Sequence, residues 1–217
     1  MSVSTARQVA DRQGNSPPPR ERILAAAREL FYRRGIHTVG VDAIAEAAGT
    51  NKMTLYRHFA SKDVLIAACL VELTREFDVA WDAIAAAHAG DPKGQLLAWL
   101  RHSGDFKEYE AERGCALANA AIELPDKDHP ARRVIREHKT ALRERLISLC
   151  RDAGLTDPER LADEIFLIWE GARVTAQSVG AQGLSARLAE TFEALVAYHA
   201  RRHRQGELHR RVRGIRR

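Results

Sequence analysis

The 217-residue chain has few aromatic residues, few cysteines and no long apolar run. Aromatic residues make up only 6% of it, and alanine is frequent, which favours helices over sheets. No apolar run approaches the ~18 residues that a membrane span needs, and the N-terminus lacks the apolar core of a signal peptide. We therefore expect a helical, cytoplasmic protein with no membrane partner.

Cysteine usage excludes a disulfide framework. Cys69, Cys115 and Cys150 are odd in number and widely spaced, and no Cys-x-x-Cys pair occurs. Each lies among apolar neighbours, so we expect buried free thiols in a reducing compartment. The sequence predicts neither a metal site nor a cofactor.

Motifs of the common enzyme classes are also missing. None of the nine histidines follows a glutamate by three residues, as a carboxylate-bridged di-metal bundle would require. The chain has no Gly-x-Ser-x-Gly elbow, no phosphate-binding glycine loop and no Gly-x-Gly-x-x-Gly. We expect a binding protein without catalytic residues.

The two ends of the chain have unusual compositions. Residues 1–19 are polar and end in three prolines, which indicates a flexible arm; contact with a DNA minor groove is the alternative. Residues 201–217 hold eight arginines and one glutamate, a net charge of +7, so the rest of the chain sums to 5 − 7 = −2. We expect residues 206–217 to form a solvated basic tail, with polyanion binding as the alternative.

The stretch from Val39 to Phe59 is the most informative part of the sequence. It predicts two short helices that meet at Gly49, whose permissive backbone suits a tight turn. Asn51 stands at the N-cap of the second helix, and Leu55 and Phe59 (i, i+4) anchor that helix. Two such helices form a helix-turn-helix, whose second helix enters the DNA major groove.

The same residues resemble a known signature. Val41-Asp-Ala-Ile-Ala-Glu-Ala-Ala-Gly49, followed by Thr54-Leu-Tyr-Arg-His-Phe-Ala-Ser-Lys62-Asp, resembles the DNA-binding region of the tetracycline-repressor (TetR) family of transcriptional regulators. The resemblance covers about residues 20–66. It implies an all-α protein in which a three-helix DNA-binding domain joins a larger helical domain for ligand binding and dimerisation.

The resemblance also implies a function. We expect a one-component regulator, a repressor, that binds a pseudo-palindromic double-stranded DNA operator as a homodimer and is released by a small-molecule effector. A DNA-binding regulator or adaptor without ligand control is the alternative, and the motif does not fix the sign of regulation.

Side-chain chemistry assigns roles at the DNA end. Lys52 and Lys62 are cations suited to phosphate, and Lys62 begins a helix, where free amides also favour an anion. Arg57 could reach guanine, with phosphate contact or solvent exposure as the alternative. The complete predicted DNA-binding set is Gly40, Asn51, Lys52, Met53, Thr54, Tyr56, Arg57, His58 and Lys62.

The remaining elements follow from apolar spacing and from proline and glycine. A first helix carries an apolar stripe from Ile23 to Phe31 and ends at Gly35. Ser61 should cap a helix that runs from Lys62 to about residue 89, roughly 40 Å long, linking the DNA end to the rest of the protein. Further helices are predicted over 93–111, 114–123, 131–153, 158–179 and 184–205.

Residues 67–205 are expected to bind the effector and to form the dimer. Periodicity gives the last two helices apolar faces that fit internal packing as well as dimerisation, and the TetR resemblance favours a four-helix dimer interface. Its predicted members are Leu161, Ile165, Trp169, Leu188, Phe192 and Leu195. His199 and His203 are interpreted as surface residues, with a metal pair as the alternative.

The candidate effector residues are polar or aromatic groups on otherwise apolar helices. They are Trp99, His102, Phe106, Asn119, Trp169 and Arg173. Asn119 lies in the apolar run after Cys115 and needs a hydrogen-bond partner if it is buried. That partner could be a ligand, a water or a backbone carbonyl.

Overall fold

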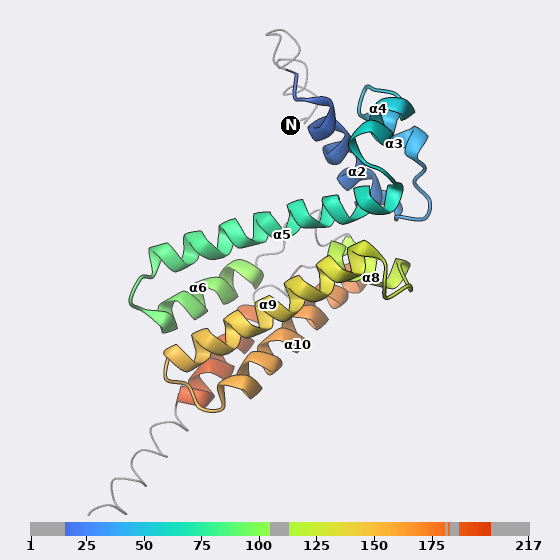
Figure 1. Ribbon diagram of the computed structural model, residues 1–217. Coiled ribbons are helices and arrows are strands. Elements are labelled where there is room, and N and C mark those ends of the chain that lie inside the picture. The colour runs from blue at the N-terminus through green and yellow to red at the C-terminus, as the bar shows by residue number, and fades with distance from the viewer. Residues whose placement is uncertain (1–15, 105–112, 181, 183–186, 201–217) are drawn as a thin grey trace, which may run out of the picture.

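The protein is helical throughout the residues that its computed structural model describes, namely 16–104, 113–180, 182 and 187–200. No strand occurs in these ranges, which confirms the predicted all-α class. The arm before residue 16, the basic tail, Phe106 and His203 lie outside them. The helices are α2 (Pro19–Arg34), α3 (Val41–Ala47), α4 (Lys52–His58), α5 (Lys62–Ala87), α6 (Pro92–Gly104), α8 (Ala116–Glu123), α9 (Pro130–Asp152) and α10 (Pro158–Val179), followed by a helix over 187–200 (Figure 1).

Helices α2, α3 and α4 gather at one end of the molecule, over the first turns of α5 (Figure 1). Ile23 of α2, Ile44 of α3 and Leu55 of α4 are fully buried in one apolar cluster, which continues into α5. The same cluster contains buried residues of α8 and the first turns of α9. The predicted boundary near residue 66 therefore falls inside a shared core; the division into domains stays a prediction.

Helix α5 connects the two ends of the molecule. It runs for 26 residues without a break, about 39 Å. The hydroxyl of Ser61 accepts a hydrogen bond from the Val64 amide at 3.1 Å and caps the helix, as predicted. Its two halves belong to different apolar clusters.

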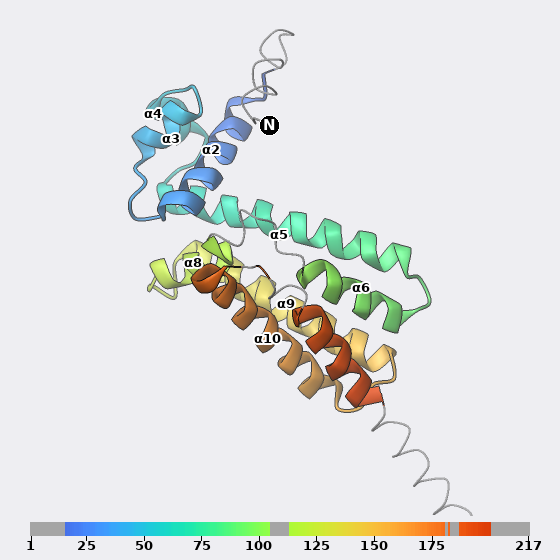
Figure 2. The same ribbon diagram turned by 180° about the vertical axis from the view of Figure 1, so that it is seen from behind.

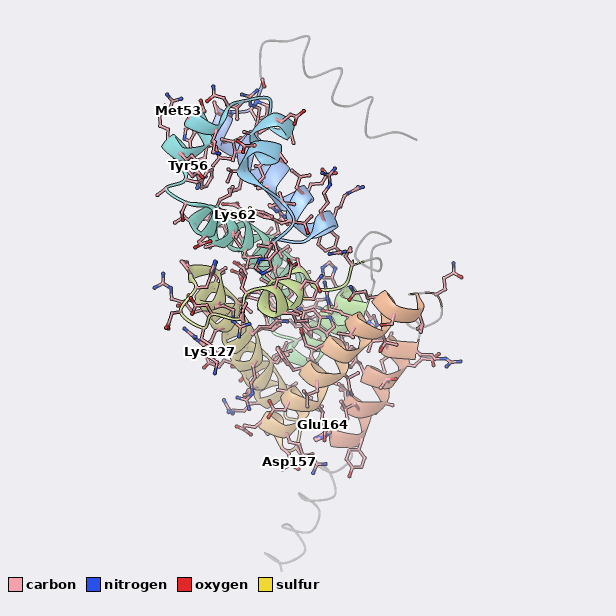
Figure 3. All side chains as sticks on the ribbon, turned by 90° about the vertical axis from the view of Figure 1, so that its right-hand side faces the viewer. Met53, Tyr56, Lys62, Lys127, Asp157 and Glu164 are labelled. Atoms are coloured by element: carbon pink, nitrogen blue, oxygen red, sulfur yellow. The ribbon has the colours of Figure 1, made fainter. Side chains whose placement is uncertain are left out.

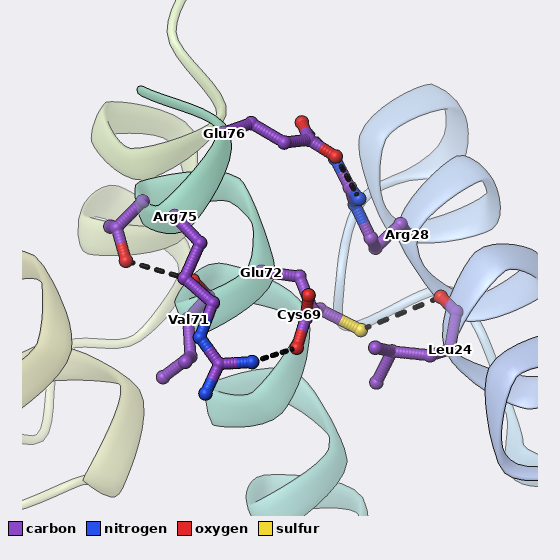
Figure 4. Close-up of polar contacts among 8 residues, drawn as sticks. Leu24, Arg28, Cys69, Val71, Glu72, Arg75 and Glu76 are labelled. Carbon is purple, nitrogen blue, oxygen red and sulfur yellow. Dashed lines mark hydrogen bonds and ion pairs between the residues drawn. The ribbon is translucent and has the colours of Figure 1, made fainter. Parts of the chain in front are cut away.

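Polar contacts fasten α2 to α5. The Arg28 guanidinium donates to both carboxylate oxygens of Glu76, at 2.6 and 2.7 Å, and the Cys69 thiol faces the Leu24 carbonyl at 3.9 Å (Figure 4). A bidentate arginine–carboxylate pair fixes relative orientation as well as distance. These contacts join the supporting helix of the DNA end to the long helix.

The far half of α5, with α6, α9, α10 and the helix over 187–200, encloses a second apolar cluster (Figure 2). It contains Trp81, Trp99 and Trp169, which are all the tryptophans of the chain. The ring centroids of Trp99 lie 5.5 Å from those of Trp81 and 5.8 Å from those of Trp169. Phe77 lies beside Trp99 and Trp169, so the core of this half is continuous aromatic packing.

Most predicted helix limits agree with the structure within two residues. Helices α6, α9 and α10 begin at Pro92, Pro130 and Pro158, because proline suits the first helical position, where no amide donor is needed. Helix α6 is described from Pro92 to Gly104, and the rest of its predicted span, 105–111, lies outside the described residues.

The cysteine prediction is confirmed. All three cysteines are free and buried. Burial raises the pKa of the Cys69 and Cys150 thiols to about 12, which keeps them protonated and unreactive at neutral pH. None of the described helices combines the length and apolar character needed to cross a bilayer.

Candidate DNA interface

The turn between α3 and α4 closes as a glycine C-cap. Gly49 has φ +61°, its amide donates to the Glu46 carbonyl at 3.0 Å, and the Thr50 amide donates to the Ala45 carbonyl at 2.9 Å. These are the two hydrogen bonds of a Schellman motif, which ends a helix and turns the chain sharply. Residue 49 needs glycine because side chains disfavour positive φ.

Local caps fix where each helix of the motif begins. Gly40 is the N-cap of α3, in extended conformation. The side-chain oxygen of Asn51 accepts a hydrogen bond from the Thr54 amide at 2.9 Å and so caps α4. The Asn51 cap was predicted and is confirmed, although the Asn51 side-chain oxygen is thereby used within the protein.

Helix α4 is anchored on one face and open on the other. Leu55 and Phe59 are buried, and the Arg20 guanidinium lies 5.3 Å from the centre of the Phe59 ring. Met53 is 83% exposed, and Tyr56 is also exposed. Figure 3 shows these two side chains at the outer edge of the molecule, in the position of a recognition helix that is free to enter a groove.

The outward face carries positive charge that is partly balanced. Lys52, Arg57 and His58 are exposed. The Lys52 ammonium lies 3.2 Å from a carboxylate oxygen of Asp42 on α3. An exposed pair of this kind contributes little to stability, so a phosphate can displace Asp42 at small cost.

Comparisons with known proteins agree with this geometry. A family model described as "Bacterial regulatory proteins, tetR family" matches residues 23–69, and a "Tetracyclin repressor-like, C-terminal domain" model matches residues 92–192. The structure of a putative TetR transcriptional regulator from Streptomyces avermitilis is 33% identical, with a TM-score of 0.68, over 84% of this chain and 98% of that chain. The chain belongs to the TetR family.

Other members of the TetR family extend the likeness. A TetR-family regulator from Streptomyces coelicolor matches with a TM-score of 0.78 and 29% identity, over 83% of this chain and 95% of that one. The "HTH-type transcriptional activator FasR" of Mycolicibacterium smegmatis is 48% identical over 107 residues, which are 47% of this chain and 48% of that protein. The chain thus spans about half the length of this curated relative. The chain is a transcriptional regulator with a helix-turn-helix DNA-binding region.

Lys62 does not have the placement expected of a phosphate ligand. Its ammonium donates to the Ile36 carbonyl at 2.6 Å and lies 5.8 Å from the centre of the Phe31 ring. Figure 3 shows Lys62 away from the outer edge that Met53 and Tyr56 occupy. The sequence placed Lys62 correctly at the start of α5, and in the structure one of its three N–H donors contacts the α2–α3 connection.

The candidate effector residues are only partly brought together. Trp99 and Trp169 pack in the aromatic cluster, and the Arg173 guanidinium lies 5.2 Å from the centre of the Trp169 ring. The Asn119 amide donates to the Arg113 carbonyl at 2.5 Å, so a backbone carbonyl is a partner of that side chain. His102 is exposed on α6, one turn after Trp99.

Two grooves are present elsewhere on the described surface. One of about 260 Å³ lies between α5 and α9 and is lined by Asp78, His138 and Arg145 among others. A second of about 240 Å³ lies at the junction of the DNA end with α8 and α9, beside His37 and His129. None of the candidate effector residues lines either groove, so the effector site stays a prediction.

The residues predicted for the dimer interface face inward. Leu161, Ile165, Trp169, Leu188 and Phe192 are buried within the single chain, and Leu195 packs partly buried against them. A side chain with no accessible surface cannot supply new contact area to a second copy. Periodicity identified the buried face of each helix, but that face packs against other helices of the same chain.

The exposed face of α10 carries the apolar side chains that could meet a second copy. Leu167 is 70% exposed and Val174 is 58% exposed, with Gly171 between them at helical spacing. On the following helix Tyr198 is also exposed. Dimerisation itself stays a prediction.

The interpretation of His199 as a surface residue is wrong. His199 is only 1% exposed, and its Nδ1 lies 2.5 Å from the Thr156 carbonyl while its Nε2 lies 3.4 Å from a carboxylate oxygen of Glu164. The Thr156 hydroxyl donates back to the His199 carbonyl at 2.8 Å. The residue fastens the last described helix to the α9–α10 connection. Among the described residues no group of three possible ligands is placed to hold a metal ion.

Two residues that contact the DNA end were not predicted from the sequence. Arg20 follows three prolines at the start of α2 and stacks on Phe59 beneath α4, where its exposed charge lies close to the motif. Glu123 ends α8 and contacts the α2–α3 connection from a distance of 87 residues in sequence. A basic residue at the first helix start could have indicated Arg20, whereas no local pattern predicts a contact as remote as that of Glu123.

Proposed function

We propose that the protein is a cytoplasmic repressor that binds a pseudo-palindromic operator as a homodimer and leaves it when a small molecule binds the C-terminal region. The observation that carries the DNA-binding part is α4, which presents Met53, Tyr56 and Arg57 outward on anchors that are buried. Helices held in this way enter the major groove without rearrangement.

The dimer is supported by the apolar stripe on α10. Leu167 and Val174 would lose their exposed apolar surface to a second copy, and the small Gly171 would allow the two helices to approach closely. A two-fold dimer places its two recognition helices about one DNA turn apart, or a multiple of it, which accounts for a pseudo-palindromic site.

Effector control is supported by the match of residues 92–192 to the "Tetracyclin repressor-like, C-terminal domain" model. The alternative is a regulator or adaptor without ligand control. Operator affinity unchanged across a metabolite panel would favour that alternative.

Activation is a second candidate for the sign of regulation. The Mycolicibacterium smegmatis relative that is 48% identical over 107 residues carries the name of an activator. A reporter gene under the operator distinguishes the two signs: deletion of the regulator raises expression for a repressor and lowers it for an activator.

The decisive experiment is selection of DNA bound by the full chain, starting from the chain's own promoter region. We expect enrichment of a pseudo-palindrome and a mass that corresponds to two chains for each DNA duplex. Failure to enrich any palindrome would overturn the proposal. Repetition with a metabolite panel tests the effector part independently.

A further inference from the structure

Two successive peptide units of the α2–α3 connection, on either side of Ile36, form hydrogen bonds with oppositely charged side chains. The Glu123 carboxylate at the end of α8 accepts hydrogen bonds from the Ile36 amide at 2.6 Å and the His37 amide at 3.2 Å. The Lys62 ammonium at the start of α5 donates to the Ile36 carbonyl at 2.6 Å. Hydrogen bonds to a charged group are stronger than those between neutral groups, and each of these contacts involves a charged side chain, either the Glu123 carboxylate or the Lys62 ammonium.

Two further observations show that the contact is closely fitted. The His37 ring donates from Nε2 to the Glu123 carbonyl at 2.5 Å, so backbone and side chain of Glu123 both contact the connection. A Cβ atom at Gly35, where φ is +85°, would lie 3.1 Å from a Glu123 carboxylate oxygen. Only glycine combines this backbone conformation with this approach.

The location of the contact gives it a consequence for DNA binding. The α2–α3 connection leads directly into the N-cap of α3, so its position sets where the helix-turn-helix lies relative to the C-terminal region. Ile36 also belongs to the buried cluster of the DNA end, which makes the connection stiff. On the other side, Arg132 of α9 donates to the Ala121 carbonyl at 2.6 Å and fixes the last turn of α8.

We propose that Glu123 and Lys62 are positioning residues that lock the helix-turn-helix at a fixed orientation and so determine which spacing between operator half-sites the dimer accepts. This inference rests on the proposed function as a dimeric operator-binding regulator. It assigns to the charge of Lys62 a role in geometry rather than in phosphate binding. The effect of Glu123 is on the relative placement of the two recognition helices, since it does not reach the face that α4 presents to DNA.

The test compares Glu123→Ala and Glu123→Gln with the wild type on the selected operator and on versions with one base pair added to or removed from the centre. We expect the wild type to prefer the selected spacing, Glu123→Ala to reduce that preference about five- to tenfold, and Glu123→Gln to lie between them. The glutamine keeps an acceptor oxygen but not the charge.

Glu46→Ala is the matched control. Glu46 is exposed on α3, and its loss removes one negative charge from the DNA end without touching the α2–α3 connection. By charge alone, both alanine variants should bind DNA more tightly. If Glu123 fixes the orientation of the helix-turn-helix, Glu123→Ala should also bind operators with altered half-site spacing, and Glu46→Ala should not. Equal spacing preference in the two variants would overturn the inference.

Amide hydrogen exchange tests the contact without DNA. We expect the Ile36 and His37 amides to exchange about tenfold faster in Glu123→Ala, with α4 amides unchanged, if the fold of the DNA end is intact. Unchanged exchange at Ile36 would overturn the inference, whatever the DNA result. Failure of the wild type to select a palindrome would instead remove the proposed function and leave the contact itself measurable by exchange.

Discussion

The DNA end and the aromatic half of the molecule are both built from helices, but they expose their chemistry differently. At the DNA end short helices are fixed by local caps, so side chains such as Met53 are free to face outward. In the other half the distinctive side chains, including Trp99 and Trp169, pack into the core. The outward-facing residues of the DNA end could therefore be predicted from sequence, because local caps fix the backbone there. An effector site could not, because the candidate residues also pack in the core.

The strongest test of this contrast compares two fully buried leucines. Leu55→Ala in α4 and Leu146→Ala in α9 should each lower the free energy of unfolding by about 2–5 kcal/mol, because each leaves a cavity. Urea denaturation followed by circular dichroism measures this. Only Leu55→Ala should also abolish operator binding under conditions where both variants are folded. Equal operator affinity in the two variants would contradict the contrast.

The next largest effect concerns the dimer. Val174→Asp places a charge in the apolar stripe of α10, so a protein that forms dimers through this face should become monomeric in light scattering. Val79→Asp is the control, because Val79 is 70% exposed on α5, away from that stripe. A Val174→Asp protein that remains dimeric would move the interface elsewhere.

Arg57 tests base reading against backbone binding. Arg57→Ala should weaken operator binding by about 1–3 kcal/mol and relax the preference at one base position if the side chain reaches a base edge. Titration against operators with single base changes measures both quantities. Arg33→Ala on α2 removes an exposed arginine outside the motif and serves as the control. Uniform weakening on every sequence would assign Arg57 to phosphate.

The salt dependence of operator binding should distinguish Lys52 from Lys62. Lys52→Ala should reduce the salt dependence of operator binding by about one unit of slope per protomer, because an exposed phosphate contact is lost. Lys62→Ala should reduce the slope less, since the Lys62 ammonium is half-buried and donates to the Ile36 carbonyl. Binding isotherms at several salt concentrations measure both. An equal loss of slope in the two variants would restore Lys62 to the phosphate-binding set.

The smallest predicted effect lies in the groove between α5 and α9. Burial, followed by the charge of Lys139, lowers the pKa of His138 below its usual value of about 6.5. The unfolded chain therefore takes up this proton at higher pH than the folded one. Protonation of His138 therefore does not lower the free energy of unfolding above about pH 7, and it lowers this free energy progressively as the pH falls below 6.5. His138→Gln should flatten that decline in thermal melts between pH 7 and 5.

Short-range chemistry explains what could be predicted from sequence. The side chains of Asn51 and Ser61 accept hydrogen bonds from amides a few residues away, so their capping roles are visible in the local pattern. Proline and glycine marked the helix limits for the same reason. The class of fold and the motif therefore followed from the sequence.

Tertiary partners explain what could not be predicted. The apolar face that contains Leu161 and Ile165 is clear in sequence, but periodicity cannot say whether a second copy or the same chain covers it. His199 looks like a surface residue in an arginine-rich stretch, yet it is buried against Thr156. Glu123 and Lys62 acquire their roles only when α8 and α5 meet the α2–α3 connection.

The shared apolar cluster at the DNA end has a consequence for dissecting this protein. Leu117, Leu124 and Ile135 close one wall of the core that supports the helix-turn-helix, although they lie far beyond it in sequence. A fragment cut after α5 would lack that wall, leave the remaining apolar core open to water and lose the carboxylate that contacts the Ile36 amide. We therefore expect deletion of the C-terminal half to remove apolar packing that supports the helix-turn-helix.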